Sequence, residues 1–391
     1  MSSALSPIYG RLPVAFTHGK GVWLWDTEGK RYMDALSGIG VSCLGHAHPA
    51  MVKAISEQAA KVIHTSNLYE IPLQEALAQR ICEISGLSEV FFANSGAEVN
   101  EGAIKVARLY GHQKGIQTPT IITMDSSWHG RTIATLAATG SEKAREGFGP
   151  LPDGFVQVTY NNIAAIEKAA ATCPDIVAVL VEVLQGEGGI RPSDIEYVQA
   201  LRKMCDERDW LLMIDEVQSG IGRTGKWLGH QWSGVTPDVV TLAKGLGGGV
   251  PIGAVAIGGR AAGLLKPGHH GTTFGGGPLV CAASIAVLDT LAQDGLLEHA
   301  QTLGSAMISR LKSELGNVPG VLEVRGQGLM IGVELERPCA ELVRTALARG
   351  FLINVTRDKV VRLLPPLILT ESEADELLDN LIPMITEFLA Q

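Results

Sequence analysis

The sequence predicts an α/β protein built on a mostly parallel β-sheet that is covered by helices, followed by a smaller α+β part. Several short apolar runs lack the polar alternation of a half-exposed strand, which is typical of strands buried on both faces. Helix-like amphipathic segments separate these runs along the chain, as in parallel α/β sheets. After about residue 290 the order of elements changes, which indicates a second, smaller unit.

The elements of the first part follow one another in chain order. Residues 22–25 and 31–34 are expected to form a hairpin, because the turn residues Asp26-Thr-Glu-Gly29 lie between them. Amphipathic patterns predict helices over residues 50–64, 72–84 and 198–207. Buried strands are expected at residues 90–93, 120–123, 177–181, 211–214, 239–242 and 254–257.

The second part begins with a long predicted helix over residues 298–315. Strands are expected at 320–325 and 329–335, then a helix near 340–349, two short strands, and a closing helix that starts at the capping-box pair Thr370 and Glu373. A chain of 391 residues exceeds what one hydrophobic core usually serves. We therefore predict an N-terminal segment 1–50 that packs with the small domain, a large cofactor-binding domain 51–290 and a small domain 291–391.

Composition excludes several classes of function. With 32 basic and 41 acidic residues the net charge is −9, which argues against nucleic acid or an anionic membrane as the partner. The six cysteines lack CxxC spacing and indicate a reducing compartment. The start of the chain does not resemble a signal peptide and no apolar stretch approaches ~20 residues, so we expect a cytoplasmic protein. The histidines lack a metal-ligand pattern, so no metal is expected.

Asp215 and Lys244 each follow an apolar, strand-like run. This pair suits pyridoxal phosphate, because the amine would hold the cofactor's aldehyde and the carboxylate would keep the pyridine nitrogen protonated. Alone, the pair is weak evidence for such a site, since an Asp at a strand end is common and a Lys usually lies at the surface.

Other residues would complete a site for this cofactor. Ser95 and Gly96 lie between a strand and a helix, and a helix N-terminus binds phosphate, although a plain helix cap explains them too. Trp128 would stack on one face of the ring and Val217 on the other, the alternative being a core Trp. Gln218 would donate to the phenolic oxygen of the ring, or be an ordinary loop residue.

Substrate carboxylates need planar, bidentate cations, for which Arg131 and Arg362 are the candidates. Arg362 interrupts an apolar strand, which is costly unless its charge finds a partner. Glu187 is a possible partner, and a surface salt bridge is the alternative.

Together these motifs resemble the class-III (ω-amino acid) aminotransferases, which have the aspartate-aminotransferase fold (pyridoxal phosphate fold type I). The resemblance spans nearly the whole chain, and the motifs taken together in this order are more specific to the family than any single motif. Its motifs are Gly21-Val-Trp-Leu-Trp-Asp, Leu44-Gly-His-Ala-His-Pro, Asn94-Ser-Gly-Ala-Glu, Trp128-His-Gly-Arg-Thr, Gln185-Gly-Glu-Gly-Gly, Asp215-Glu-Val-Gln-Ser-Gly, Lys244-Gly-Leu-Gly-Gly-Gly, His270-Gly-Thr-Thr-Phe-Gly-Gly and Arg325-Gly-Gln-Gly-Leu-Met.

The resemblance implies that Lys244 binds pyridoxal 5'-phosphate and that Asp215 is the partner of the pyridinium. Gly96 and Ala97 would bind the phosphate, with Ser95 nearby. It also implies that Thr273 reaches the phosphate in the neighbouring subunit, so that a homodimer shares its active sites. For the substrates, it implies that the first arginine, at 131, takes the distal carboxylate of the amino donor. Arg362 would take the α-carboxylate of 2-oxoglutarate, and Glu187 would hold it aside while the donor is bound.

The amino donor implied by the resemblance is N2-acetylornithine, whose δ-amino group would pass to 2-oxoglutarate in arginine biosynthesis. Ile39 stands where members that act on ornithine tend to carry a Tyr, and an apolar side chain suits an acylated amine. Ornithine, succinylornithine and 4-aminobutyrate stay open as donors. Trp128, Val183 and Gly277 depart from the usual family pattern, and Trp128 would change the width of the pocket.

Two other classes of function compete. The glycine clusters suggest a dinucleotide oxidoreductase, but Lys244-Gly-Leu-Gly-Gly-Gly lacks the spacing of that fingerprint. A non-catalytic regulator with the same fold is disfavoured because Lys244, Asp215, Arg131 and Arg362 are all present.

Overall fold

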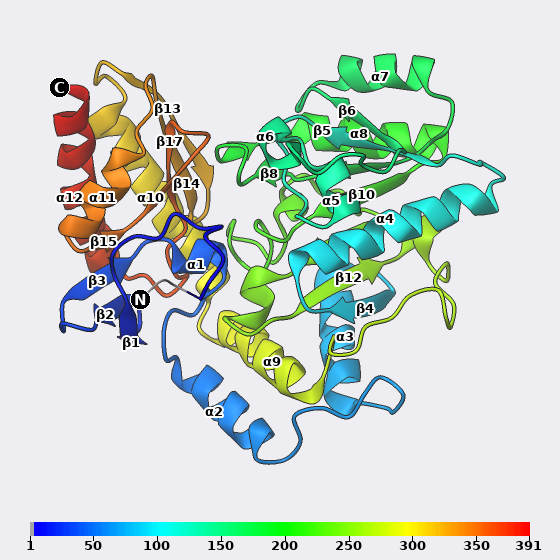
Figure 1. Cartoon of the computed structure of the whole chain (residues 1–391), viewed down its shortest axis with the longest axis horizontal. Coiled ribbons are helices and arrows are strands. Elements are labelled where there is room, and N and C mark those ends of the chain that lie inside the picture. Colours follow the sequence, from blue (N-terminus) through cyan, green and yellow to red (C-terminus); the bar gives the residue numbers. More distant parts are fainter. Residues whose placement is uncertain (1–3) are drawn as a thin grey trace.

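A computed structural model describes residues 4–391. A seven-stranded sheet forms its centre (Figure 1), and only β12 runs antiparallel to its neighbours, so the predicted mostly parallel sheet is confirmed. In spatial order the strands are β4 (Glu89–Ala93), β12 (Gly253–Ile257), β11 (Val239–Leu242), β10 (Leu211–Asp215), β7 (Ile176–Val181), β5 (Thr120–Met124) and β6 (Phe155–Val158).

Helices cover both faces of this sheet. Leu211 and Met213 of β10 pack in one cluster with α4 (Gly96–Gln113). Leu212 and Ile214 pack in another with residues of α8 (Ile195–Arg208) and α7 (Ile163–Thr172). Successive residues of a strand point to opposite faces of the sheet. Since helices cover both faces, the residues of β10 on either face are buried. This is why the central strands are continuous apolar runs.

A further hydrophobic cluster joins parts of the chain that are distant in sequence. It contains residues of α2 (Pro49–Ala59), α3 (Pro72–Ser85) and α9 (Pro278–Gln293). It continues into α10 (Leu296–Leu315) and α12 (Glu371–Leu389), which lie with α11 (Glu341–Ala348) at the left of Figure 1. Smaller elements are α5 (Ile133–Ala138), α6 (Glu142–Arg145), η1 (Gly229–Trp232), η2 (Lys244–Gly247) and η3 (Gly259–Ala261).

Two four-stranded sheets lie beside this cluster, and β8 (Leu184–Gln185) and β9 (Arg191–Pro192) form a small two-stranded one. The first has the antiparallel order β13 (Val321–Gln327), β14 (Met330–Leu335), β17 (Val360–Leu363) and β16 (Asn354–Thr356). The second has the order β1 (Phe16–Lys20), β2 (Trp23–Asp26), β3 (Arg31–Asp34) and β15 (Phe351–Leu352), and α1 (Ser37–Gly40) follows β3. The predicted hairpin is confirmed in β2 and β3, and β15 adds to β3 in parallel. The division of the chain into three segments stays a prediction.

A few sequence predictions were wrong or incomplete. The helix expected over 50–64 ends at Ala59. The edge strand β6 was not predicted, because its four residues are only partly buried. α9 was also missed, since it is apolar over most of its surface and shows little of the polar periodicity that marks a helix. The capping box of Thr370 and Glu373 is present in full at the start of α12.

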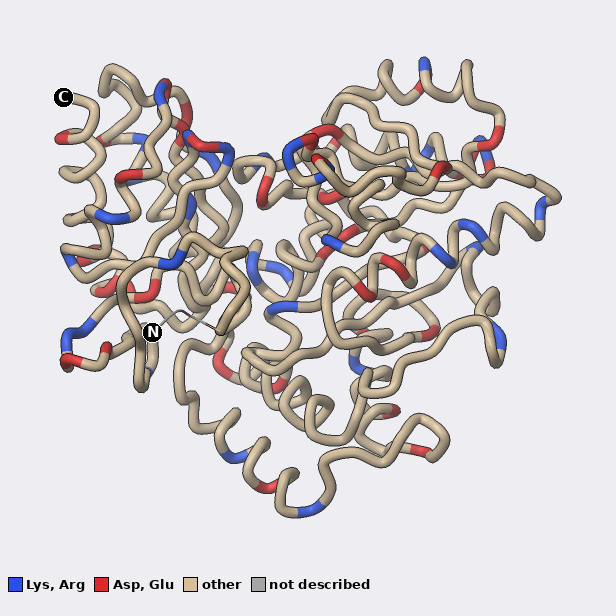
Figure 2. Tube along the Cα trace, in the orientation of Figure 1, with Lys and Arg blue, Asp and Glu red and all other residues tan. Residues whose placement is uncertain are grey.

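Among the described residues no single helix is long and apolar enough to cross a membrane. The pair α9 and α10, taken together across a 65° bend, passes that test on length and composition alone. Figure 2 shows Lys and Arg interspersed with Asp and Glu along the whole chain.

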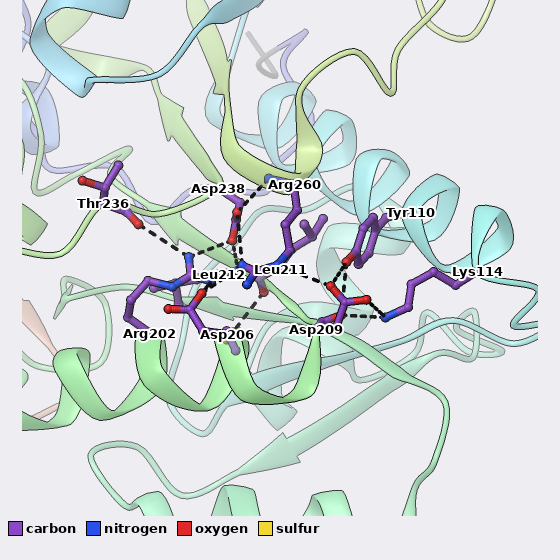
Figure 3. Close-up of polar contacts among 11 residues, drawn as sticks. Tyr110, Lys114, Arg202, Asp206, Asp209, Leu211, Leu212, Thr236, Asp238 and Arg260 are labelled. Carbon is purple, nitrogen blue, oxygen red and sulfur yellow. Dashed lines mark hydrogen bonds and ion pairs between the residues drawn. The ribbon is translucent and has the colours of Figure 1, made fainter.

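A network of charged residues ties the amino ends of the central strands together (Figure 3). Asp238 accepts hydrogen bonds from Arg202 Nη1 at 2.8 Å and from the backbone N–H of Leu212 at 2.9 Å. Asp206 and Asp209 pair with Arg260. Since β10 starts at Leu211 and ends at Asp215, this network lies at the opposite edge of the sheet from Asp215 and stabilises the fold there.

Candidate active site

A cavity of about 490 Å³ lies at the carboxyl ends of the parallel strands, the usual position of a ligand in such sheets. The loops after β4, β5, β7, β10 and β11 form its wall. The cavity is bordered by these predicted site residues: Ser95, Gly96, Ala97, Trp128, Arg131, Glu187, Asp215, Val217, Gln218 and Lys244.

Asp215 is fixed by three hydrogen bonds. Its Oδ2 accepts from Asn100 Nδ2 at 2.7 Å and from His129 Nδ1 at 2.8 Å. Its Oδ1 accepts from the backbone N–H of Val217 at 3.0 Å. Thr241 in turn donates to Asn100 Oδ1 at 2.8 Å. The carboxylate is thus held rigidly at the cavity wall, with only 3% of its residue surface exposed.

Glu182 is a second buried carboxyl beside Asp215. In the parallel pair of β7 and β10, Val181 lies opposite Ile214, so the residues that follow them are neighbours. Glu182 accepts hydrogen bonds from the backbone N–H groups of Trp128 and Gly186. Burial raises the pKa of this carboxyl to about 7.

His129 links the two acids electrostatically. Burial disfavours its protonated form, but the hydrogen bond to Asp215 and the negative charges of Asp215 and Glu182 outweigh that effect and raise the pKa of the imidazole. The Nδ1–H of His129 donates to Asp215 and so fixes the imidazole beside the two carboxyls.

Lys244 begins η2 directly after β11, with φ 44°, a left-handed conformation that non-glycine residues rarely adopt. Such strain persists where the surroundings impose it, often at functional sites. Burial lowers the pKa of its amine, opposed by Glu187 and assisted by Arg362. A lowered pKa leaves more of the amine neutral and able to attack an aldehyde.

The N-terminus of α4 opens onto the cavity. Ser95 caps it, and its hydroxyl accepts from the backbone N–H of Glu98 at 3.3 Å. The Glu98 carboxylate accepts from Asn94 and does not close a capping box. A Cβ on Gly96 would lie 2.8 Å from Val217 Cγ1, so only glycine lets the helix start this close to Val217. The first N–H groups of a helix have no intrahelical partner, which suits an anion here.

Of the two predicted substrate arginines, Arg131 borders the cavity, whereas Arg362 does not border it but contacts the wall residues Glu187 and Gln218. Arg131 is exposed, and its guanidinium lies 4.6 Å from the centroid of the Trp128 ring. Arg362 is completely buried. Its Nη1 donates to Glu187 Oε1 at 2.7 Å and to Gln218 Oε1 at 3.3 Å, and its Nε donates to Asn354 Oδ1 at 3.0 Å. Within residues 4–391 its Nη2 has no hydrogen-bond partner.

Ile39 and Thr273 do not border the cavity. Ile39 is 38% exposed, and the cavity wall nearby is formed by Val41. Thr273 lies on an exposed loop beside Phe274, which is 66% exposed. Within this chain, therefore, neither side chain takes part in the cavity, and the expected roles of both stay predictions.

Three residues of the site were not singled out by the sequence analysis as binding the cofactor: Asn100, His129 and Glu182. His129 was interpreted as a packing or loop residue. A signal for Glu182 existed, because it directly follows the apolar strand 176–181 as Asp215 follows 211–214. In the described part of the chain, no group of three His, Cys, Asp or Glu residues has a geometry that would hold a metal ion.

Comparisons with known proteins identify the family. A class-III aminotransferase family model matches residues 5–385. The chain belongs to the class-III aminotransferases. It is 64% identical to acetylornithine aminotransferase 1 of Bordetella bronchiseptica over the whole of both chains.

Solved structures agree in fold. Ornithine aminotransferase from Toxoplasma gondii has a TM-score of 0.95 and 32% identity, with 98% of this chain and 93% of that chain covered. Acetylornithine aminotransferase from Elizabethkingia anophelis has a TM-score of 0.86 and 33% identity, with 98% and 96% covered. The fold is pyridoxal phosphate fold type I, as expected.

The enzyme is a transaminase dependent on pyridoxal 5'-phosphate. The cavity fits this group, because the capped start of α4, the fixed carboxylate of Asp215 and the amine of Lys244 all border the same space. Trp128 and Val217 also border it, as two side chains that enclose a flat ring would.

Proposed function

We propose that the enzyme transfers the δ-amino group of N2-acetylornithine to 2-oxoglutarate, giving N-acetylglutamate 5-semialdehyde and glutamate. The observation that carries this proposal is the 2.7 Å pair of Glu187 and Arg362 beside Lys244. It masks one substrate arginine and leaves Arg131 free of carboxylate partners among the described residues. The site thus suits an ω-amine whose carboxylate lies far from the reacting carbon. Names of relatives such as that from Bordetella bronchiseptica support the same donor.

In this proposal the protein's own residues divide the work. When bound, pyridoxal phosphate supplies an aldehyde and a ring that withdraws electrons from the carbon bonded to nitrogen. Lys244 Nζ would bind the aldehyde in the resting enzyme, and the same amine, once released, would accept the proton that leaves the donor's Cδ. Asp215 would keep the ring nitrogen protonated, and Gln218 would donate through its amide nitrogen to the phenolic oxygen. Its Oε1 already faces Arg362, which leaves that amide free to point elsewhere.

The phosphate and the carboxylates have their own partners. We assign the phosphate to the N–H groups of Gly96 and Ala97 with the hydroxyl of Ser95. Arg131 binds the distal carboxylate of both substrates in turn. Arg362 binds the α-carboxylate of 2-oxoglutarate once Glu187 has turned away, and its unpartnered Nη2 completes a bidentate contact.

We assign donor choice to the apolar character of Ile39, which is 38% exposed and lies two residues before Val41 of the cavity wall rather than in the wall itself. An ammonium at the donor's α-position would lose hydration near this side chain without gaining an anionic partner, whereas an acetylated nitrogen carries no charge. A desolvation difference of ~2–3 kcal/mol corresponds to roughly 30- to 150-fold discrimination.

We also propose a cytoplasmic homodimer with shared active sites. The six cysteines are free, as is usual in a reducing compartment. Large apolar side chains gather in two loops that are joined by hydrogen bonds. Asn67 in the first loop donates to the backbone carbonyls of Thr272 and Gly275 in the second. The exposed ones are Ile63, Leu68, Tyr69 and Phe274. Exposed apolar side chains of this size mark protein interfaces, and a partner there would bring Thr273 to the other subunit's phosphate.

A donor panel tests the proposal. We expect kcat/KM with 2-oxoglutarate to be highest for N2-acetylornithine among that amine, succinylornithine, ornithine and 4-aminobutyrate. Lys244→Ala should be inactive with each of them while the protein remains folded, as circular dichroism would show. Equal turnover of ornithine and acetylornithine would overturn the donor, and activity of Lys244→Ala would overturn the lysine's role.

A further inference from the structure

The loop that carries Glu187 is fixed to the sheet that carries Arg362. Within Gly186–Ile190, the backbone carbonyl of Glu187 accepts from Thr356 Oγ1 at 2.6 Å. The carbonyl of Gly189 accepts from Arg325 Nη2 at 2.6 Å, and that of Ile190 accepts from Arg325 Nε at 2.8 Å. Arg325 is in β13 and Thr356 in β16, two strands of the four-stranded sheet that contains Arg362.

The loop is strained, so these contacts are needed to keep its shape. Ile190 has φ 52° and Gly189 has φ 106°. A β-branched residue in the left-handed region is a conformational outlier and persists only when its surroundings impose it. Ile190 is fully buried, and a Cβ on Gly332 of β14 would lie 2.9 Å from its Cβ.

Arg325 is itself well anchored. Its Nη1 pairs with Glu323 at 2.6 Å and with Glu334 at 2.5 Å. The guanidinium therefore uses one nitrogen to hold the sheet and the other two to hold the loop. This is the rigid fork geometry that a lysine lacks.

We propose that Arg325 is a positioning residue of the active site. By fixing the backbone of residues 186–190, it keeps Glu187 on Arg362 and restricts release of Arg362 to a rotation of the Glu187 side chain. Arg325, assisted by Thr356, thereby sets how strongly the enzyme prefers an ω-amino donor to an α-amino acid. The inference rests on the proposed function, in which Glu187 masks Arg362 for the donor.

Two variants test this inference, with a matched control. Arg325→Gln removes the fork, and Thr356→Val removes only a hydroxyl in a side chain of nearly equal size. Arg310→Gln is the control, because Arg310 also bridges carboxylates, Glu314, Asp375 and Asp379, but on α10 away from the loop.

The first measurement is the single half-reaction with N2-acetylornithine and with glutamate, followed by the absorbance of the bound cofactor. Loss of the charge-assisted bonds of Arg325 should lower the ratio of the two kcat/KM values about tenfold in Arg325→Gln, and loss of one neutral hydrogen bond should lower it about threefold in Thr356→Val. Arg310→Gln should leave the ratio unchanged. A ratio within about twofold of the parent in both loop variants would overturn the inference, and Thr356→Val decides it if Arg325→Gln does not fold.

The second measurement is hydrogen exchange, which needs no catalysis. The N–H groups of Gly189 and Ile190 donate to the carbonyl of Gly186. They should exchange faster in both loop variants than in the parent or in Arg310→Gln. Unchanged exchange would show that the loop needs no tether and would overturn the inference. If the parent does not transaminate N2-acetylornithine, the proposed function fails, while the exchange experiment still judges the tether.

Discussion

At the scale of single residues, two buried carboxyls stand side by side with different partners. Asp215 accepts from Asn100, His129 and the backbone of Val217. The carboxyl oxygens of Glu182 accept, among the described residues, from the backbone N–H groups of Trp128 and Gly186. Asp215 is thus placed where it could face the ring nitrogen of the cofactor. Glu182 is placed where its own gain or loss of a proton changes the charge next to Asp215.

The pKa of about 7 for Glu182 predicts a pH dependence. As pH rises through 7, Glu182 becomes anionic, and its negative charge favours a protonated His129 beside Asp215. We expect the rate of the donor half-reaction to rise across this range. Glu182→Gln should remove the inflection near pH 7, whereas Glu167→Gln, an exposed residue on α7, should retain it. An unchanged profile in Glu182→Gln would assign the inflection to another group.

The two arginines should give different kinetic results. Arg362→Ala should impair the half-reaction with 2-oxoglutarate by about 100-fold or more, since an α-carboxylate loses a bidentate, charge-assisted contact. The donor half-reaction should change far less, because Glu187 masks Arg362 there. Arg131→Ala should slow both half-reactions. Single-turnover absorbance of each half-reaction measures these effects, and equal losses for Arg362→Ala in both would contradict its assignment.

Sequence patterns predicted the residues that border the cavity better than the side chains to which these residues are hydrogen-bonded. Asp215 and Lys244 follow apolar strands, and motifs marked Arg131 and Glu187. The contact of His129 with Asp215 could not be predicted, because it joins the loop after β5 to the end of β10 across the intervening strand β7. Thr273 is the opposite case, since its motif is plain in the sequence while its expected partner belongs to another chain.

At the scale of elements, the approach of α4 to the loop after β10 shapes the end of the cavity to which we assign the phosphate. Ser95 caps the helix, and Gly96 lets Val217 pack against its first turn. The position of the helix therefore depends on a missing side chain.

Gly96→Ala tests this dependence. The new methyl would lie 2.8 Å from Val217 Cγ1, so the helix start and Val217 must move apart. We expect the affinity for pyridoxal phosphate to fall about tenfold, equivalent to ~1.4 kcal/mol, as measured by titration of the apoenzyme. Gly10→Ala is the control, because a Cβ there has no heavy atom within 4 Å. Normal affinity in Gly96→Ala would show that the site tolerates the shift.

The sequence indicated the existence of elements more reliably than their direction. All predicted central strands are present, because continuous apolar runs report burial on both faces. The sequence of residues 254–257 does not indicate that β12 is antiparallel to its neighbours, because the hydrophobic pattern of a strand is the same in either direction.

At the scale of the whole molecule, the proposed dimer predicts complementation between defective chains. Thr273→Val should weaken phosphate binding, and Lys244→Ala should be inactive. A hybrid of the two would contain one site with both an intact Lys244 and the partner's intact Thr273. Mixing should therefore raise activity at limiting cofactor above that of Thr273→Val alone.

The control for this experiment is the double variant Lys244→Ala, Thr273→Val. Mixed with Thr273→Val, it supplies no intact Thr273 and should give no gain. No gain with Lys244→Ala would place Thr273 in the site of its own chain, and a gain with the double variant would show that the rescue does not depend on Thr273.

The parallel pairing of β15 with β3 has a consequence for how the chain is made. Met33 pairs with Phe351 and Asp34 with Leu352, so the sheet started by β1, β2 and β3 is completed by residues synthesised more than three hundred positions later. Val22 and Met33 also share a core with Leu381 and Phe388 of the last helix. Because contacts this distant in sequence form slowly, the first hairpin emerges from the ribosome long before its neighbours exist. Its strands therefore stay exposed until residues 351–388 have been synthesised.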